Sequence, residues 1–281
     1  MTPIGNKLYL KITNNCNLKC PFCYSPRIDK DLGCDNLDFY INKYNIENLV
    51  FHGGEPLLKY DKVKEIINKY NLNFHLVSNL CIDINKDIEY IISRCGLATS
   101  YSVDRFNQFT FNKWLKNIDY LHSINKNFTL IITLSEQQLN QSIESLLFVI
   151  NRVNANYVSF ERCHGNYNED FYIKSDDYLC NVSKKISKLK NVNFLVFKKA
   201  IDQGVPCINY ECEKTTFTLD YKNTVYTCPS LCEGSVGQWD KSRCLVCEYF
   251  KYCRGDCPSF RGVCAFPKKF FNWVKYANVD N

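Results

Sequence analysis

The chain has 281 residues, of which 46% are hydrophobic and 23% are charged. This composition excludes a largely disordered chain, and a chain of this length buries a core without disulfide staples. The formal net charge of +6 is mild, and no run of Lys and Arg resembles a nucleic-acid patch. We therefore expect no nucleic-acid partner.

Neither export nor membrane insertion is indicated. No window offers about 18 uninterrupted apolar residues, so no transmembrane helix and no membrane partner are expected. The N-terminal stretch MTPIGNKLYLKIT lacks the apolar core and the small-residue cleavage site of a signal peptide. We predict a cytoplasmic protein. In that compartment thiols stay reduced, so the 17 cysteines favour metal or cluster ligation over disulfides.

The first two thirds of the chain alternate strand and helix patterns. Short β-branched and aromatic runs predict strands over residues 7–12, 48–52, 73–78, 98–103, 128–134 and 157–161. Apolar residues at helical spacing predict helices over residues 62–70, 112–123 and 139–153, with a further helix over 176–189 and a strand over 193–197. Such alternation is typical of parallel β/α units. We predict an α/β domain over residues 1–199 and a second, cysteine-rich domain over residues 200–281.

Three cysteines follow the first predicted strand directly. Cys16, Cys20 and Cys23 form a CxxxCxxC motif in a loop that a parallel β/α fold places at the carboxyl end of the sheet, where ligands bind. Three thiolates on one short loop can hold three irons of a 4Fe–4S cluster and leave the fourth iron open. The alternatives are a zinc site completed elsewhere or three chance cysteines.

The segment CNLKCPFCY resembles the cluster-binding loop of the radical S-adenosylmethionine (radical SAM) enzymes. The resemblance implies a partial (β/α)6 barrel similar to a TIM barrel. It also implies that the open iron binds S-adenosylmethionine, that an electron from the cluster cleaves this cofactor, and that the resulting 5′-deoxyadenosyl radical abstracts a substrate hydrogen.

Polar and glycine residues after the later strands match further motifs of that family. The HGGEP segment, residues 52–56, follows the second strand and matches the family's GGEP motif, whose glycines let the backbone approach a ligand closely. Ser-Val-Asp at the end of the fourth strand resembles the S-[IVL]-D segment. Each strand-end position could instead be an ordinary turn or helix cap. The resemblance implies cofactor contacts by Phe22, Gly53, Gly54, Glu55, Pro56, Ser78, Asn79, Ser102, Asp104, Thr133 and Arg162.

The C-terminal part carries a second cysteine cluster. Its CxxCx5CxxxC motif resembles the SPASM domain, the auxiliary-cluster domain of many radical SAM peptide modifiers, which contains a β-hairpin and short helices. TTFTLDYKNTVYTC predicts two strands around a turn at residues 221–224, where Asn223 can adopt the left-handed geometry of the glycine usual in the family. Two zinc ribbons or a thiol-rich tail are the alternatives.

The SPASM resemblance implies two auxiliary 4Fe–4S clusters, and hence three clusters in all. The family's interleaved pattern assigns one of them to Cys207, Cys212, Cys228 and Cys257. It assigns the other to Cys244, Cys247, Cys253 and Cys264. Cys232 could compete as a ligand. Cys163, after the sixth strand, could donate a hydrogen atom to a substrate radical, as in peptide epimerases.

We therefore predict a radical SAM oxidoreductase of the SPASM type that crosslinks or otherwise modifies a ribosomal peptide. Formylglycine-type sulfatase maturation and peptide epimerisation are alternatives, and an iron–sulfur electron-transfer or redox-regulatory protein is an alternative of another class. Pro229 follows Cys228 where sulfatase-maturing relatives carry an acid, which counts against that alternative. The expected partners are a peptide or protein substrate and a low-potential electron donor (flavodoxin or ferredoxin). Because the chain begins almost at the first strand, we expect a leader to be bound by a separate leader-binding protein or by the cavity alone.

Overall fold

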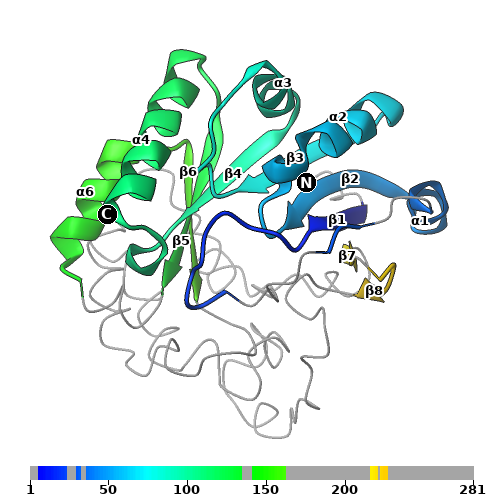
Figure 1. Ribbon diagram of the computed structural model, residues 1–281, viewed down its shortest axis with the longest axis horizontal. Helices are drawn as coiled ribbons and strands as arrows, with labels where there is room; N and C mark the ends of the chain where they lie inside the picture. The colour runs from blue at the N-terminus through cyan, green and yellow to red at the C-terminus, as the bar shows by residue number, and fades with distance from the viewer. Residues whose placement is uncertain are drawn as a thin grey trace, which may run out of the picture.

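The core of the molecule is one twisted sheet whose first six strands run parallel (Figure 1). The computed structural model describes residues 6–23, 30–32, 36–134, 141–162, 216–220 and 222–226. The strands lie in the order β6-β5-β4-β3-β2-β1-β7-β8. The six parallel strands are β1 (Asn6–Thr13), β2 (Ile46–Gly53), β3 (Asn73–Ser78), β4 (Gly96–Tyr101), β5 (Phe128–Leu134) and β6 (Tyr157–Arg162). The predicted α/β fold with a parallel sheet is confirmed.

Helices connect the strands and lie along the outer side of the curved sheet in Figure 1. They are α1 (Leu37–Lys43), α2 (Tyr60–Lys69), α3 (Lys86–Arg94), α4 (Gln108–Ser123) and α6 (Ile143–Val153), with the 3₁₀ helices η1 (Pro56–Lys59) and η2 (Val103–Arg105). The three helices predicted over 62–70, 112–123 and 139–153 are present as α2, α4 and α6, whereas α1 and α3 were not predicted. Among the described helices, none has the length and apolarity needed to cross a bilayer.

The fourth predicted strand was wrong by two residues at each end. It covers Gly96–Tyr101, and Val103 already belongs to the 3₁₀ helix η2. Ser102 still follows the strand directly. The predicted helix over 176–189 and strand over 193–197 lie outside the described residues.

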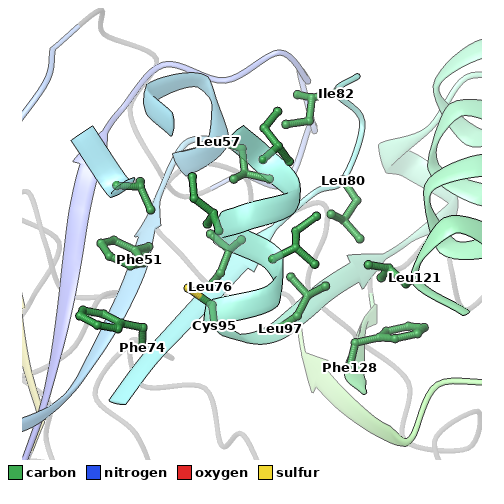
Figure 2. Packing of buried hydrophobic residues seen from close by; sticks show 14 of the residues in the cluster. Phe51, Leu57, Phe74, Leu76, Leu80, Ile82, Cys95, Leu97, Leu121 and Phe128 are labelled. Carbon is green, nitrogen blue, oxygen red and sulfur yellow. The ribbon is translucent and has the colours of Figure 1, made fainter. Parts of the chain in front are cut away.

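The two faces of the sheet differ in burial. In β3 and β4, buried residues such as Phe74, Leu76 and Leu97 alternate with partly exposed ones such as His75 and Val77. Figure 2 shows Phe74, Leu76 and Leu97 in the apolar core, together with Cys95 at the end of α3. The helix-covered face therefore supplies the core, and the opposite face stays partly accessible.

A short hairpin extends the sheet beyond β1. Strand β7 (Thr216–Leu219) pairs in parallel with β1, and β8 (Val225–Tyr226) pairs antiparallel with β7. Asn223 in the turn has φ 58, so the predicted left-handed residue and hairpin are confirmed. The carboxylate of Asp220 fixes this turn by accepting from the backbone nitrogens of Lys222 and Thr224, each at 2.9 Å.

Candidate functional site

The CxxxCxxC motif occupies the loop after β1, at the carboxyl end of the sheet. Cys20 is buried, while Cys16 and Cys23 are partly exposed, and the backbone nitrogen of Cys23 donates to the carbonyl of Cys20 at 3.2 Å. Burial raises the pKa of Cys16 to about 11, and the negative charge of Glu55 acts in the same direction. A metal centre on this loop must therefore displace the thiol proton of Cys16.

Within the described part of the chain, no three His, Cys, Asp or Glu side chains converge on one metal-ion position. A 4Fe–4S cluster does not require such convergence, because each of its thiolates binds a different iron. The chemistry of this donor set, three thiols on one loop, therefore fits a cluster with one open iron.

Two glycines of the HGGEP segment pack against the start of the cysteine loop. The nitrogen of Gly54 donates to the carbonyl of Thr13 at 2.7 Å, and that of Glu55 donates to the carbonyl of Asn15 at 2.8 Å. A Cβ at Gly53 would lie 2.2 Å from the oxygen of Thr13, and one at Gly54 would lie 2.1 Å from the oxygen of Asn15. The close approach that these glycines permit is thus made to the backbone of the cysteine loop.

Glu55 is a fully buried carboxylate that joins the end of β2 to the end of β3. Oε1 accepts from the hydroxyl of Ser78 at 2.9 Å and from the nitrogen of Leu57 at 3.0 Å. Oε2 accepts from the nitrogen of Asn79 at 2.7 Å. The bond to Leu57 caps η1, which begins at Pro56. Burial raises the pKa of Glu55, although these three donors oppose the shift.

The side chain of Asn79 forms hydrogen bonds that link the end of β3 to the cysteine loop. Its Nδ2 atom donates to Oδ1 of Asn17 at 2.8 Å and to Sγ of Cys16 at 3.6 Å. The structure therefore brings Cys16, Glu55, Ser78 and Asn79 together in one hydrogen-bonded hub.

The predicted residues after β4 and β5 lie at the same edge of the sheet. Ser102 is buried and its hydroxyl donates to Oδ2 of Asp104 at 3.1 Å. Thr133 lies near the end of β5, where it is paired in register with Glu161 of β6, and it is partly exposed. Arg162 is the last residue of β6.

The sequence prediction missed Arg105. Its guanidinium Cζ lies 5.8 Å from the centroid of the Phe22 ring, and its Nη1 donates to the carbonyl of Ser100 at 3.0 Å and to the Ser100 hydroxyl. Its positive charge favours the ionised form of Glu55 and so partly offsets the rise in the pKa of Glu55 that burial causes. The available signal was a basic residue directly after the Ser-Val-Asp segment. Arg105 thus ties the cysteine loop to the end of β4.

The sequence prediction also missed a polar pair on the partly accessible face. Lys11 of β1 is 1% exposed and is paired in register with His52 of β2. Burial, followed by the charge of Lys11, lowers the pKa of His52 to about 3, so this imidazole is neutral near pH 7.

The predicted auxiliary ligands lie outside the described residues. These are Cys207, Cys212, Cys228, Cys244, Cys247, Cys253, Cys257 and Cys264. The same holds for Cys163 and Cys232. Their roles stay predictions.

No protein-family model matches the chain. An uncharacterized protein of Methanocaldococcus jannaschii is 30% identical over 108 residues, which cover 34% of this chain and 38% of that protein. An uncharacterized protein of Archaeoglobus fulgidus is 23% identical over 103 residues, covering 34% of this chain and 25% of the relative. The chain thus matches well under half the length of these curated relatives.

Solved structures resemble the chain over nearly its whole length. Native anSMEcpe with bound AdoMet and the Cp18Cys peptide has a TM-score of 0.74 at 16% identity, covering 95% of this chain and 96% of that one. Streptococcus suis SuiB bound to the precursor peptide SuiA has a TM-score of 0.61 at 14% identity, covering 90% and 72%. The chain has the fold of these proteins, so the fold implied by the resemblance to radical SAM enzymes is confirmed.

Proposed function

We propose that the chain is a radical SAM enzyme of the SPASM type that modifies a peptide. The observation that carries the proposal is the hub of Cys16, Glu55, Ser78 and Asn79, which joins the cysteine loop to the HGGEP segment at the carboxyl end of the sheet. Neither an electron carrier nor a redox regulator needs that second segment beside its cluster loop.

Each part of the hub has its own task in this proposal. Cys16, Cys20 and Cys23 would hold a 4Fe–4S cluster, and the backbone of the HGGEP segment would receive the amino group of S-adenosylmethionine. Glu55 would hold that segment in place and not bind the cofactor through its carboxylate, because the carboxylate already accepts hydrogen bonds from three protein donors. Ser102 and Asp104 would reach the ribose or the carboxylate. When bound, the cluster and its cofactor supply a carbon radical that abstracts a substrate hydrogen.

The peptide substrate class has support from the fold neighbours. Both anSMEcpe and SuiB are solved with bound peptides, Cp18Cys and SuiA respectively. We propose crosslinking or related modification of a ribosomal peptide, with two auxiliary clusters on the C-terminal cysteines. A flavodoxin or ferredoxin would supply electrons.

Anaerobic turnover tests the radical chemistry. The protein is reconstituted with iron and sulfide, reduced and given S-adenosylmethionine, and 5′-deoxyadenosine is quantified. Cys16→Ala is expected to abolish this product. Cys95→Ala is the matched control, because it removes a thiol buried in the helix-covered core (Figure 2) and should keep the product. Wild-type protein that binds iron and forms no 5′-deoxyadenosine, even with candidate peptides, would contradict the proposal.

Mass spectrometry of a peptide encoded beside the gene then separates the reaction types. A crosslink removes a pair of hydrogens between two side chains. Formylglycine appears as an aldehyde at a single Cys or Ser. Epimerisation leaves the mass unchanged in water and adds deuterium in heavy water.

A further inference from the structure

The side-chain amide of Asn79 has an orientation that the chain itself dictates. Its Oδ1 atom accepts from the backbone N–H of Cys81 at 2.8 Å. A backbone N–H can only donate, so Oδ1 must face Cys81 and Nδ2 must face the cysteine loop. There Nδ2 meets Oδ1 of Asn17 at 2.8 Å and Sγ of Cys16 at 3.6 Å. The group presented to the sulfur of Cys16 is therefore a donor.

The turn that carries Asn79 is held from several sides. Leu80 is buried and has φ 52, in the left-handed region that leucine rarely adopts. The hydroxyl of Ser78 accepts from the nitrogen of Leu80 at 3.0 Å. The side chain of Asn117 in α4 donates to the carbonyls of Leu80 and Ile82, each at 2.7 Å. Unfavourable backbone persists where its surroundings over-determine it, so this turn presents Asn79 in one position.

The sulfur of Cys16 accepts a second N–H, from the backbone of Leu18 at 3.4 Å. Asn79 is 8% exposed, so little water competes for its donor. Hydrogen bonds to cysteine sulfurs are among the factors that set the reduction potential of an iron–sulfur cluster. A donor stabilises the reduced cluster more than the oxidised one, because the added electron increases the negative charge on the sulfur.

We propose that Asn79 is a positioning residue that raises the reduction potential of the cluster on Cys16 through this N–H···S bond. The effect is electrostatic, with no bond made or broken in Asn79, and it eases electron entry from the donor. This inference rests on the proposed function, because it requires a 4Fe–4S cluster on the CxxxCxxC loop.

Two variants remove the donor and keep the turn. Asn79→Ser retains an oxygen that can accept from the N–H of Cys81, as serine does in such turns, but it cannot reach Cys16. Asn79→Asp has nearly the same shape and places an acceptor where the donor was. Asn17→Ala is the matched control, since it removes the other acceptor of Nδ2, together with the bond from Asn17 to the carbonyl of Cys81, but keeps the amide donor of Asn79 beside Cys16.

The midpoint potential is measured by an anaerobic redox titration, following the electron paramagnetic resonance signal that changes when S-adenosylmethionine is added. Both Asn79 variants should titrate at more negative potential, with Asn79→Asp the lower of the two. A tenfold weakening of reduction equals 59 mV for a one-electron couple, and we expect up to about that shift. Asn17→Ala should have the same midpoint potential as the wild type.

The outcomes separate this inference from the proposed function. Loaded Asn79 variants that titrate with the wild type, or that shift no further than Asn17→Ala, would overturn the tuning role. A wild-type chain with no S-adenosylmethionine-sensitive signal would overturn the proposed function itself. If Asn79→Ser loses iron, Asn79→Asp, which keeps the shape of the side chain, decides the question.

Discussion

The Oε2 atom of Glu55 lies 2.7 Å from the backbone nitrogen of Asn79, so a carboxylate at the end of β2 fixes the turn at the end of β3. The two residues are 24 positions apart in the chain and both are buried. The side chain of Asn79 donates in turn to Cys16 and Asn17, so the HGGEP segment is linked to the cysteine loop through Asn79. Changing either one should therefore disturb the other.

Glu55→Gln should destabilise the protein by about 1–3 kcal/mol. The carboxylate accepts from three donors, whereas a glutamine side chain turns one of its two ends into a donor. One of the three protein donors would then face the NH2 group of the glutamine and would stay buried without an acceptor. Urea unfolding measures the change. Glu47→Gln, on an exposed position of β2, is the control and should stay within about 0.5 kcal/mol of wild type.

The stability difference between wild type and Glu55→Gln should depend on pH. Burial raises the folded-state pKa of Glu55 above its usual value. The folded protein then holds the proton more tightly than the unfolded chain, so this contribution is fully present below the unfolded pKa and is lost as the pH rises through the folded pKa. Glutamine does not titrate. Unfolding of both proteins between about pH 4 and pH 8 should show the wild type's relative stability falling with rising pH; a relative stability that grows with pH would refute this.

Thr99→Val should lower the free energy of unfolding by about 1–3 kcal/mol, because it leaves a buried indole N–H without a hydrogen-bond acceptor. Nε1 of Trp114 in α4 donates to Oγ1 of Thr99 in β4 at 3.1 Å, and both residues are fully buried. Valine has nearly the same shape, so loss of packing contributes little. Thr129→Val, on the partly exposed face of β5, is the matched control, and an equal loss there would argue against the role of this hydrogen bond.

The fold followed from the sequence wherever the period of the apolar residues was clear. Strands β3 and β5 have the predicted bounds, because turn-forming polar residues flank their apolar runs. Helix α3 was missed although Ile88, Ile91 and Ile92 stand at helical spacing and Asn85 caps its start. The helix has only nine residues, and packing against the sheet stabilises so short a helix more than the helix propensity of its residues does.

The candidate site was predictable only as far as motifs reach. Cys16 and Glu55 stand in recognisable segments, and the structure joins them through Asn79. Arg105 and Lys11 belong to no motif. Their places depend on where β4 ends and on the register of β1 with β2, which pairs Lys11 with His52 from 41 residues away (52 − 11). The apolar alternation of each strand determines which of its faces is buried, but it does not show which residue of a distant parallel strand each residue will pair with.

Gly54→Ala should reduce the iron content of the reconstituted protein and lower its thermal midpoint. The added Cβ would lie 2.1 Å from the oxygen and 2.6 Å from the carbon of Asn15, both backbone atoms that cannot rotate away. The start of the cysteine loop must move, and the hydrogen bonds from Gly54 to Thr13 and from Glu55 to Asn15 would break with it.

Gly96→Ala is the matched control for that prediction. A Cβ there would lie 2.7 Å from Nδ1 of the His75 side chain, and a side chain on the partly accessible face can shift aside. Iron per chain and thermal unfolding, measured on both variants, should separate a clash with backbone from a clash with a movable side chain. If Gly54→Ala loaded iron as well as Gly96→Ala does, the HGGEP segment would not be what positions the cysteine loop.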